Sequence, residues 1–279
     1  MIKTIDLKSG ETTNIYQYLS SAITPRPIAF VSSIDLNGNK NLSPFSFFNV
    51  FSVNPPILVF SPVRRVRNNS SKHTLENVSQ VKECVIALVT EEIVQQVSLS
   101  SCDFDAKTNE FIKAGFTELK SDVVRPPRVK ESPVNFECRI NDIINLGEKG
   151  GAGSLVLCEV LKIHINENIL NNNEEIDPIK LKIVSRLGSN WYGKTTQESI
   201  YEIAKPISRI GMGIDNLPEE IKNSEILTGN ELAILGSAEK IPLKKDFLLR
   251  NGKDLREKHI LAKEFLRREK INDAWQILL

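Results

Sequence analysis

The chain has 279 residues, and its 36 lysine and arginine side chains nearly balance its 35 aspartate and glutamate side chains, giving a formal net charge of +1. This balance gives no support for binding to nucleic acid or to an anionic membrane as the main task, because both require a clear excess of positive charge. Hydrophobic residues make up 41%, which is ordinary for a globular protein with one large domain or two modest ones.

Targeting and metal-binding patterns do not stand out. No apolar run approaches the length of a membrane span, and residues 1–14 hold no apolar core of signal-peptide length, so we expect a cytoplasmic protein without membrane contact. The four cysteines form no Cys-x-x-Cys pair and have no histidine at metal-ligand spacing, so we expect no metal site. Cys84, Cys138 and Cys158 lie in apolar runs typical of buried strands, whereas Cys102 is the candidate for an exposed thiol.

Two apolar runs, Ile28–Ile34 and Ile57–Phe60, predict strands because valine, isoleucine and phenylalanine dominate them and turn residues bound them. Residues 35–39 (DLNGN) predict a turn, since asparagine and glycine tolerate positive φ. The run Asn41–Ser46 contains Pro44, which cannot donate to a sheet ladder, so we interpret it as an irregular insertion. Its free amides and hydroxyls suit the edge of a planar polar ligand, and a kinked hairpin with a long loop is an equally open alternative.

The segment after residue 61 carries four cations in loop-forming sequence: Arg64, Arg65, Arg67 and Lys72. Thr74 precedes a short run with helical apolar spacing, so we predict that it caps a helix. A helix start offers free amides and the positive end of a dipole, and lysine and arginine add charge-assisted contacts, so the segment suits a phosphate. A solvated basic loop without a ligand is the alternative.

The middle of the chain alternates strands with short helices. Cys84–Val89 predicts a buried strand, and Thr90 is expected to cap the helix that follows. Residues 134–141 alternate apolar and polar side chains as a half-buried strand does, and residues 155–165 form a second long strand. The glycine-rich segment between them lacks the Gly-Lys-Ser/Thr ending of a phosphate-binding loop and predicts a wide hairpin loop. His164 is expected to be a partly exposed strand residue rather than a ligand.

Residues 186–193 (RLGSNWYG) place two adjacent aromatic residues, Trp191 and Tyr192, between glycines. Such a pair either packs a corner of the fold or offers a surface on which another ring stacks. The residues alone favour the packing role.

Strand patterns stop across residues 205–211, and helical patterns follow. The run 211–213 (GMG) lacks the third glycine of a dinucleotide-binding fingerprint. Residues 228–231 (TGNE) have the form of a capping box, and residues 255–268 and 272–279 predict two antiparallel helices whose apolar faces meet. We expect a helical extension that packs on the preceding domain or docks a partner.

Three pieces of the sequence, in a kept order, resemble the flavin reductase-like proteins, the flavoredoxin group with the FMN-binding split-barrel fold. They are residues 24–33 (TPRPIAFVSS), 41–49 (NLSPFSFFN) and 54–56 (NPP). The resemblance implies a mainly β fold, a Greek-key antiparallel barrel with short helices, over residues 1–212. The helical patterns that follow predict a C-terminal extension over residues 213–279. It also implies a homodimer that binds FMN near the subunit interface.

The resemblance further implies a set of cofactor-binding residues. Lys72 and Thr74 are similar to the family's Lys-x-Thr phosphate-binding element, with His73 where many relatives carry an aspartate. Trp191 and Tyr192 follow an Arg-Leu-Gly run that is similar to a late family motif near the flavin. The expected FMN-binding residues are Arg26, Asn41, Ser43, Pro44, Phe45, Ser46, Asn49, Ser61, Arg67, Lys72, Thr74 and Trp191.

Three functions agree with this resemblance. The first is reduction of flavin by NADH or NADPH, with the FMN cofactor performing the redox chemistry. The second is electron transfer of the flavoredoxin type, with electrons taken from a redox partner protein, and the third is flavin binding without turnover. The sequence points to no catalytic side chain, since no Ser-His-Asp, Cys-His or paired-carboxylate arrangement stands out.

Overall fold

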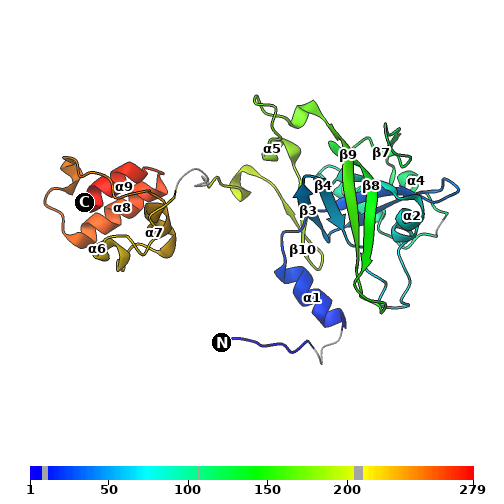
Figure 1. The fold of residues 1–279 in the computed structure, drawn as a ribbon, viewed down its shortest axis with the longest axis horizontal. Helices are drawn as coiled ribbons and strands as arrows, with labels where there is room; N and C mark the ends of the chain where they lie inside the picture. The colour runs from blue at the N-terminus through cyan, green and yellow to red at the C-terminus, as the bar shows by residue number, and fades with distance from the viewer. Residues whose placement is uncertain (8–11, 106, 204–209) are drawn as a thin grey trace. The chain divides into compact units, whose positions relative to one another are not determined.

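The computed structural model describes residues 1–7, 12–105, 107–203 and 210–279. These residues form two compact units, Met1–Tyr201 and Glu202–Leu279, each with its own apolar core (Figure 1). The division lies upstream of the boundary expected after residue 212. Residues 204–209, on which part of the expected change from strands to helices falls, lie outside the described residues.

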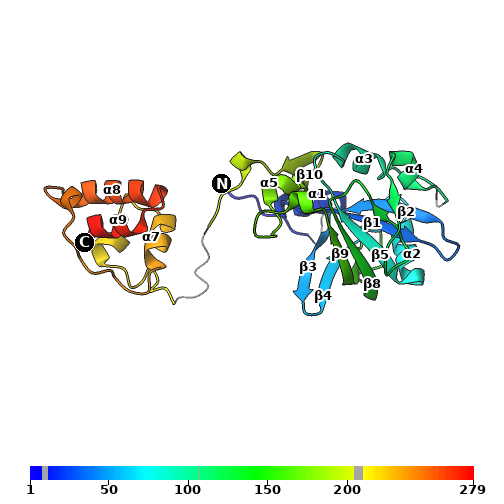
Figure 2. The same ribbon diagram turned by 90° about the horizontal axis from the view of Figure 1, so that it is seen from above.

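The first unit is built on one antiparallel sheet of seven strands, with the hydrogen-bonded order β2-β1-β5-β8-β9-β4-β3 (Figure 2). The strands are β1 (Ala29–Ile34), β2 (Lys40–Phe45), β3 (Phe48–Val53), β4 (Pro56–Phe60), β5 (Glu83–Leu88), β8 (Val134–Asn145) and β9 (Ser154–Ile165). Two small sheets pair β6 (Glu118–Leu119) with β7 (Arg128–Val129) and β10 (Val184–Gly188) with β11 (Trp191–Lys194). The five strands predicted from apolar patterns and the hairpin loop between β8 and β9 are thereby confirmed.

Short helices surround this sheet. They are α1 (Thr12–Ala22), α2 (His73–Val81), α3 (Val94–Leu99), α4 (Glu110–Ala114) and α5 (Pro178–Leu181), with 3-10 turns η1 (Glu167–Ile169) and η2 (Gln197–Ser199). Helix α2 packs against β1 and β2, and α3 and α4 contact β2. In the described part of the chain, none of the helices has the length and apolar character needed to cross a membrane.

A two-residue link fixes the curvature of the sheet. Strands β2 and β3 are its opposite edges, yet only Ser46 and Phe47 separate them in the chain. Laid flat, the two edges would lie about 29 Å apart, since neighbouring strands are about 4.8 Å apart, whereas three residue steps reach at most about 11 Å. The sheet therefore coils until the end of β2 meets the start of β3. No ladder joins these two strands over the described residues, so the barrel is split at this corner.

Strand β1 is buried on both faces because the coiled sheet carries two cores. Ala29 and Val31 face an inner core that also contains residues of α2, while Ile28 and Phe30 face an outer core shared with α3 and α4. Successive side chains of a strand point to opposite faces, so a strand between two cores reads as a continuous apolar run. This explains the apolar run Ile28–Val31 that marks the start of β1 in the sequence.

The prediction that Asn41–Ser46 is an irregular insertion is wrong, because β2 runs through this segment to Phe45. Pro44 lies opposite Phe30 of β1, and β2 is an edge strand, where a residue without an N–H is tolerated. The turn at residues 35–39 is confirmed, and the Asp35 carboxylate stabilises it by accepting two backbone amides at 2.8 Å each.

Both predicted threonine caps are wrong. The N-cap residue of α2 is Lys72 rather than Thr74, and that of α3 is Ile93 rather than Thr90. The hydroxyl of Thr74 donates to Asn41 of β2 instead of capping its own helix. The hydrogen bond to Asn41 thus occupies the hydroxyl group that would otherwise cap the helix.

The second unit is a small helical body. Its elements are α6 (Glu219–Lys222), α7 (Gly229–Gly236), η3 (Leu248–Arg250), α8 (Leu255–Arg267) and α9 (Ile271–Leu278). The capping box predicted at residues 228–231 is confirmed at the start of α7. The predicted helix pair is confirmed as α8 and α9, whose core residues include Ala262, Ala274 and Trp275.

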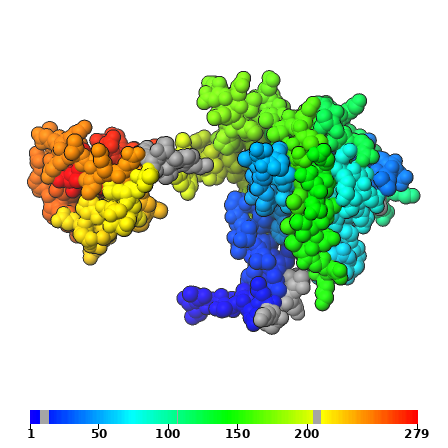
Figure 3. Space-filling view, viewed as in Figure 1, coloured from blue at the N-terminus to red at the C-terminus, as the bar shows by residue number. Residues whose placement is uncertain are grey.

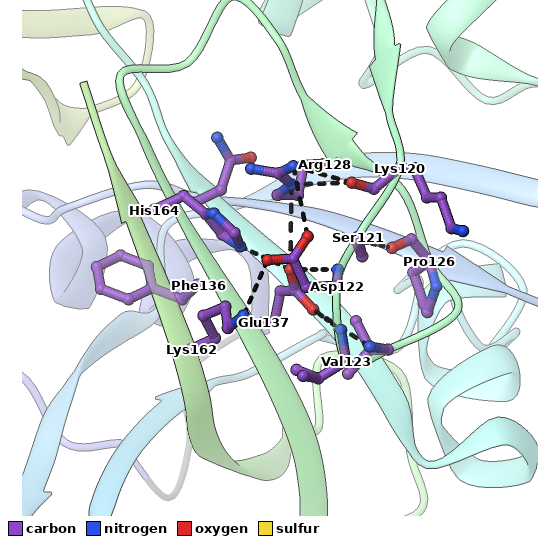
Figure 4. A network of polar contacts seen from close by, with 12 residues as sticks. Lys120, Ser121, Asp122, Val123, Pro126, Arg128, Phe136, Glu137, Lys162 and His164 are labelled. Atoms are coloured by element: carbon purple, nitrogen blue, oxygen red, sulfur yellow. Dashed lines mark hydrogen bonds and ion pairs between the residues drawn. The ribbon is translucent and has the colours of Figure 1, made fainter.

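A buried carboxylate holds the loop between β6 and β7 against the sheet (Figure 4). Glu137 of β8 is fully buried and accepts hydrogen bonds from the amides of Asp122 (2.8 Å), Val123 (2.7 Å) and Val124 (3.2 Å). His164 of β9, which is partly exposed as predicted, lies with Nε2 2.6 Å from the same carboxylate. Burial alone would raise the pKa of Glu137, but these donors together hold it below its ordinary value of 4.5.

The polar group around Glu137 is already neutralised by cations. Ligand atoms of Asp122, Glu137 and His164 lie within 4.8 Å of one another, a spacing that a metal ion could use. Lys162 Nζ lies 2.9 Å from Asp122 Oδ2, and Arg128 Nη2 lies 3.9 Å from Asp122 Oδ1. We therefore assign the group a structural role in fixing the loop.

Replacing Glu137 with glutamine should lower the free energy of unfolding by roughly 1–3 kcal/mol at neutral pH, because buried amides lose an acceptor. The carboxylate's contribution is complete above pH 4.5 and is lost as the pH falls through the lower pKa of the folded state. The difference in the free energy of unfolding between wild type and Glu137→Gln should therefore become smaller in acid. Urea unfolding at neutral pH and at a pH below 4.5 measures this difference. The control is Glu159→Gln, which removes a partly exposed carboxylate paired with Arg139. A difference in the free energy of unfolding that became larger in acid would contradict this role.

Candidate functional site

A narrow polar cleft opens beside edge strand β2 at the start of α2. It is formed by β2, the basic loop of residues 62–72, the loop after α3 and the start of α4. Its lining residues are Asn41, Ser43, Arg65, Lys72, His73, Thr74, Ser100, Ser101, Cys102, Asp103, Phe104 and Glu110. Four of the residues predicted to bind FMN therefore lie together here: Asn41, Ser43, Lys72 and Thr74.

A chain of hydrogen bonds forms the buried side of the cleft. Glu110 of α4 accepts from Asn41 Nδ2 at 2.9 Å and from the Leu42 amide at 3.0 Å. Asn41 Oδ1 in turn accepts from the Thr74 hydroxyl at 2.6 Å. Burial raises the pKa of Glu110, and the bonds from Leu42 and Asn41 oppose that rise. The relay ties β2 to α2 and α4, and the hydroxyl hydrogen of Thr74 is already used within the protein.

Three cations and one carboxylate gather on the open side of the cleft. Arg65 donates from Nε and Nη2 to Asp103 Oδ1 at 3.0 and 2.7 Å, and Arg67 pairs with the other oxygen of that carboxylate. Lys72 is half-buried, and no carboxylate within the described ranges pairs with it. Burial lowers the pKa of Lys72, and the charges of Arg65 and Arg67 lower it further. The local potential is therefore positive, which favours an anionic ligand.

The glycine-rich hairpin loop between β8 and β9 holds the basic loop in place. Arg64 donates its backbone amide to the Ala152 carbonyl at 2.9 Å and accepts from the Gly151 amide at 3.0 Å. At Gly150 a Cβ atom would lie 2.9 Å from Val66 Cα, so this close approach requires glycine. The glycine-rich loop has no phosphate-binding motif of its own. It supports the loop that carries the cations.

The corner between β2 and β3 extends the candidate site away from the cleft. The Phe47 ring lies 6.1 Å from the Tyr16 ring and 5.9 Å from the Arg26 guanidinium. The Phe47 carbonyl accepts from the Ser61 amide at 2.8 Å. Ser46 precedes Phe47 and is partly buried. Strand β2 therefore leads from the cleft directly to a corner that holds Arg26, Ser46 and Ser61.

Arg26 connects this corner to the β10–β11 hairpin. Its buried guanidinium donates to carbonyls at the end of α1, and its backbone pairs with that of Arg186 in β10. Within the hairpin, Trp191 is 74% exposed, and the Arg186 guanidinium lies 4.4 Å from the centroid of the Tyr192 ring. The packing role favoured for Trp191 is therefore wrong, because its ring faces solvent.

The remaining predicted site residues lie outside the cleft lining, and within the described ranges Arg67 alone among them forms an ion pair with a lining residue. Phe45 packs in the inner core, so a ligand can meet only its backbone, and Pro44 before it is half-buried on the edge strand. Asn49 of β3 is exposed, and its side chain accepts the amide of the next residue. Arg67 belongs to the cleft through its pairing with Asp103.

The two acidic residues of the cleft, Asp103 and Glu110, were missed in the sequence. Asp103 reaches Arg65 across 38 positions of the chain, and Glu110 reaches Asn41 across 69 positions. Neither residue belongs to a motif, and acidic residues downstream of a basic loop are too common to identify a partner. Only the assembled fold brings them together.

Comparison with known proteins identifies the family of this chain. The profile described as "Flavin reductase like domain" matches residues 20–180. An uncharacterized protein from Aquifex aeolicus is 34% identical over 192 residues, which cover 69% of this chain and 95% of that protein. The uncharacterized protein YwrF from Bacillus subtilis is 31% identical over 186 residues, covering 66% of this chain and 90% of its own. The chain therefore belongs to the flavin reductase-like family.

Solved structures share the fold of the first unit. Nitrilotriacetate monooxygenase component B from Bacillus cereus matches with a TM-score of 0.68 and 28% identity, covering 73% of this chain and 99% of its own. Two more distant matches bear on the fold alone. They are 2-nitrobenzoate 2-nitroreductase NbaA from Pseudomonas fluorescens (TM-score 0.66, 24% identity, 76% and 100% covered) and flavoredoxin from Desulfovibrio vulgaris (0.55, 17%, 66% and 92%).

These comparisons confirm a mainly β split barrel with short helices and a flavin-binding family. The family profile ends at residue 180, before the helical second unit begins.

Replacing Thr74 with valine should lower the free energy of unfolding by roughly 1–3 kcal/mol, because the buried acceptor of Asn41 loses its donor. Thr74→Ser keeps the hydroxyl and removes one methyl group, so it should cost only about 0.8 kcal/mol. Urea unfolding without flavin compares the two variants. A serine variant less stable than the valine variant would show that the hydrogen bond to Asn41 does not stabilise the cleft.

Proposed function

We propose that this protein is an NAD(P)H-dependent oxidoreductase that binds FMN in the cleft and along the β2–β3 corner. Family membership supports the oxidoreductase class. The choice of FMN is carried by one observation: Lys72, without a carboxylate partner in the described parts of the chain, stands beside Arg65 at the start of α2. A terminal phosphate is the part of FMN that such a site recognises.

The donors of the cleft fit a phosphate group. The first amides of α2 have no partner within the helix and carry the positive end of its dipole. Lys72 contributes a compact charge, and Arg65 and Arg67 contribute guanidinium forks that match phosphate oxygens. Thr74 contributes its amide rather than its hydroxyl, because the hydroxyl hydrogen is committed to Asn41.

The flavin ring, on this proposal, lies along the corner that β2 forms with β3. Hydroxyl groups and edge-strand backbone offer donors and acceptors for the polar edge of the ring. Asn41 holds its amide away from the ligand, so it positions β2 instead of touching the ring. The residues proposed to lie on the ring side are Arg26, Ser43, Pro44, Phe45, Ser46, Asn49, Ser61 and Trp191.

Bound FMN supplies the redox chemistry by accepting a hydride from NADH or NADPH. The residues of the chain bind and orient the cofactor: Lys72 and the arginines neutralise the phosphate, and the serine hydroxyls fix the polar edge of the ring. The sequence carries no dinucleotide-binding fingerprint, so the nicotinamide would stack on the flavin directly.

We also propose a homodimer, because apolar side chains on β3 and β9 are exposed. Both strands lie at the surface of the first unit in the space-filling view (Figure 3). Val50, Phe51 and Val53 of β3 are 57%, 69% and 87% exposed, and Leu161 and Ile163 of β9 are 43% and 52% exposed. Exposed apolar strands of this kind mark association surfaces. A second copy that covers β3 would lie next to the corner where the strand begins.

The four free cysteines support a reducing, cytoplasmic setting.

Anaerobic mixing of the FMN-loaded protein with NADH or NADPH tests the proposed activity. We expect the flavin absorbance band to bleach with at least one of the two nucleotides, faster than in a control with the same concentration of free FMN. A band that persists with both nucleotides would contradict a nicotinamide-dependent reductase. Such persistence would favour electron transfer of the flavoredoxin type or binding without turnover.

Replacing Lys72 with alanine should weaken FMN binding by about one to two decades, since a charge-assisted contact is worth roughly 1.5–3 kcal/mol. Riboflavin lacks the phosphate, so its affinity should stay nearly unchanged. Fluorescence titration of both flavins measures the difference, with Lys113→Ala on α4 as a control for the loss of an exposed lysine. Equal losses for the two flavins, or no loss for either, would remove the phosphate from this cleft.

A further inference from the structure

We propose that Asp103 is a built-in competitor of the flavin phosphate: its carboxylate holds the guanidinium groups that the phosphate takes on binding. This inference rests on the proposed function and adds a residue that sets the affinity and selectivity of the same site. It is carried by the ion pairs of Asp103 with Arg65 and Arg67 at the edge of the cleft.

The contacts of Asp103 are those that a phosphate would make. Arg65 presents both Nε and Nη2 to one carboxylate oxygen, at 3.0 and 2.7 Å, and Arg67 takes the other oxygen. Guanidinium groups bind carboxylates and phosphates through the same fork of N–H donors. One anion therefore excludes the other from these donors.

Arg65 does not need Asp103 to hold its position. Its Nη1 donates to the Ser70 hydroxyl at 3.1 Å and to the Ser71 carbonyl, both within the basic loop. Only 16% of the Arg65 side chain is exposed, whereas 38% of the Asp103 side chain is exposed. The arginine is thus fixed by its own loop, and the aspartate approaches from the segment after α3 as the more accessible partner.

The charges favour exchange when the ligand is a dianion. A phosphate monoester carries a charge of about −1.5 to −2 at neutral pH, against −1 for the aspartate. Lys72 has no carboxylate partner within the described ranges, so it adds its attraction to the phosphate alone. Asp103 should therefore lower the affinity for every anion, and monoanions, which gain least from the site, should be excluded.

Titration of FMN and riboflavin into wild type and Asp103→Asn tests this role. The variant should bind FMN roughly threefold to tenfold more tightly, because the two partly exposed ion pairs that the phosphate must replace are weak. Riboflavin affinity should not change. Asp105→Asn is the matched control: Asp105 is exposed, lies two positions further on, and forms no ion pair in the described segments. Its FMN affinity should rise less than twofold.

Four results would overturn the proposal. Weaker FMN binding by Asp103→Asn would mean that the aspartate positions the arginines for the ligand, and unchanged FMN binding would mean that it does not compete. If Asp105→Asn tightened FMN binding equally, the effect would come from the change in net charge. If riboflavin affinity changed equally, the effect would come from a change in the fold of the site. The proposed phosphate site is judged separately, because it fails if wild type itself binds FMN no more tightly than riboflavin.

Discussion

The structure depends on one covalent constraint, the two-residue link between the opposite edges of the main sheet. Ser46 and Phe47 are too short a connection for a flat sheet of seven strands, so the sheet coils and its edges meet at one corner. The same constraint places edge-strand hydroxyls and amides, which no ladder partner uses on the outer side, next to the basic loop and the start of α2. The candidate site is therefore a direct consequence of how the sheet coils.

Within the site, buried and partly exposed interactions have different roles. The relay from Glu110 through Asn41 to Thr74 is buried and fully paired, so it fixes the relative positions of β2, α2 and α4. The ion pairs of Asp103 are partly exposed and therefore weaker, which leaves the arginines able to change partners. A rigid frame with an exchangeable counter-ion is an arrangement suited to reversible binding of an anion.

Local sequence patterns predicted five of the seven strands of the main sheet, because apolar runs and alternation reflect burial on one or both faces. They failed at β2, since the rule against proline holds for interior strands, and the edge position of β2 is a property of the assembled sheet. They failed again at Thr74, whose hydroxyl partner lies 33 positions away. Lys72 followed from the basic loop before a helix start, and the family resemblance supported it and supplied Ser43. Asp103 and Glu110 become visible only when distant segments meet.

We propose that the cleft between β2 and α2 receives the phosphate of FMN. A crystal structure of the protein with FMN tests it most directly. We expect a phosphate oxygen within hydrogen-bonding distance of Lys72 Nζ and of an amide in the first turn of α2, with the flavin ring running toward the corner at Ser46. A phosphate bound elsewhere, for example beside Trp191 on the β10–β11 hairpin, would contradict the account.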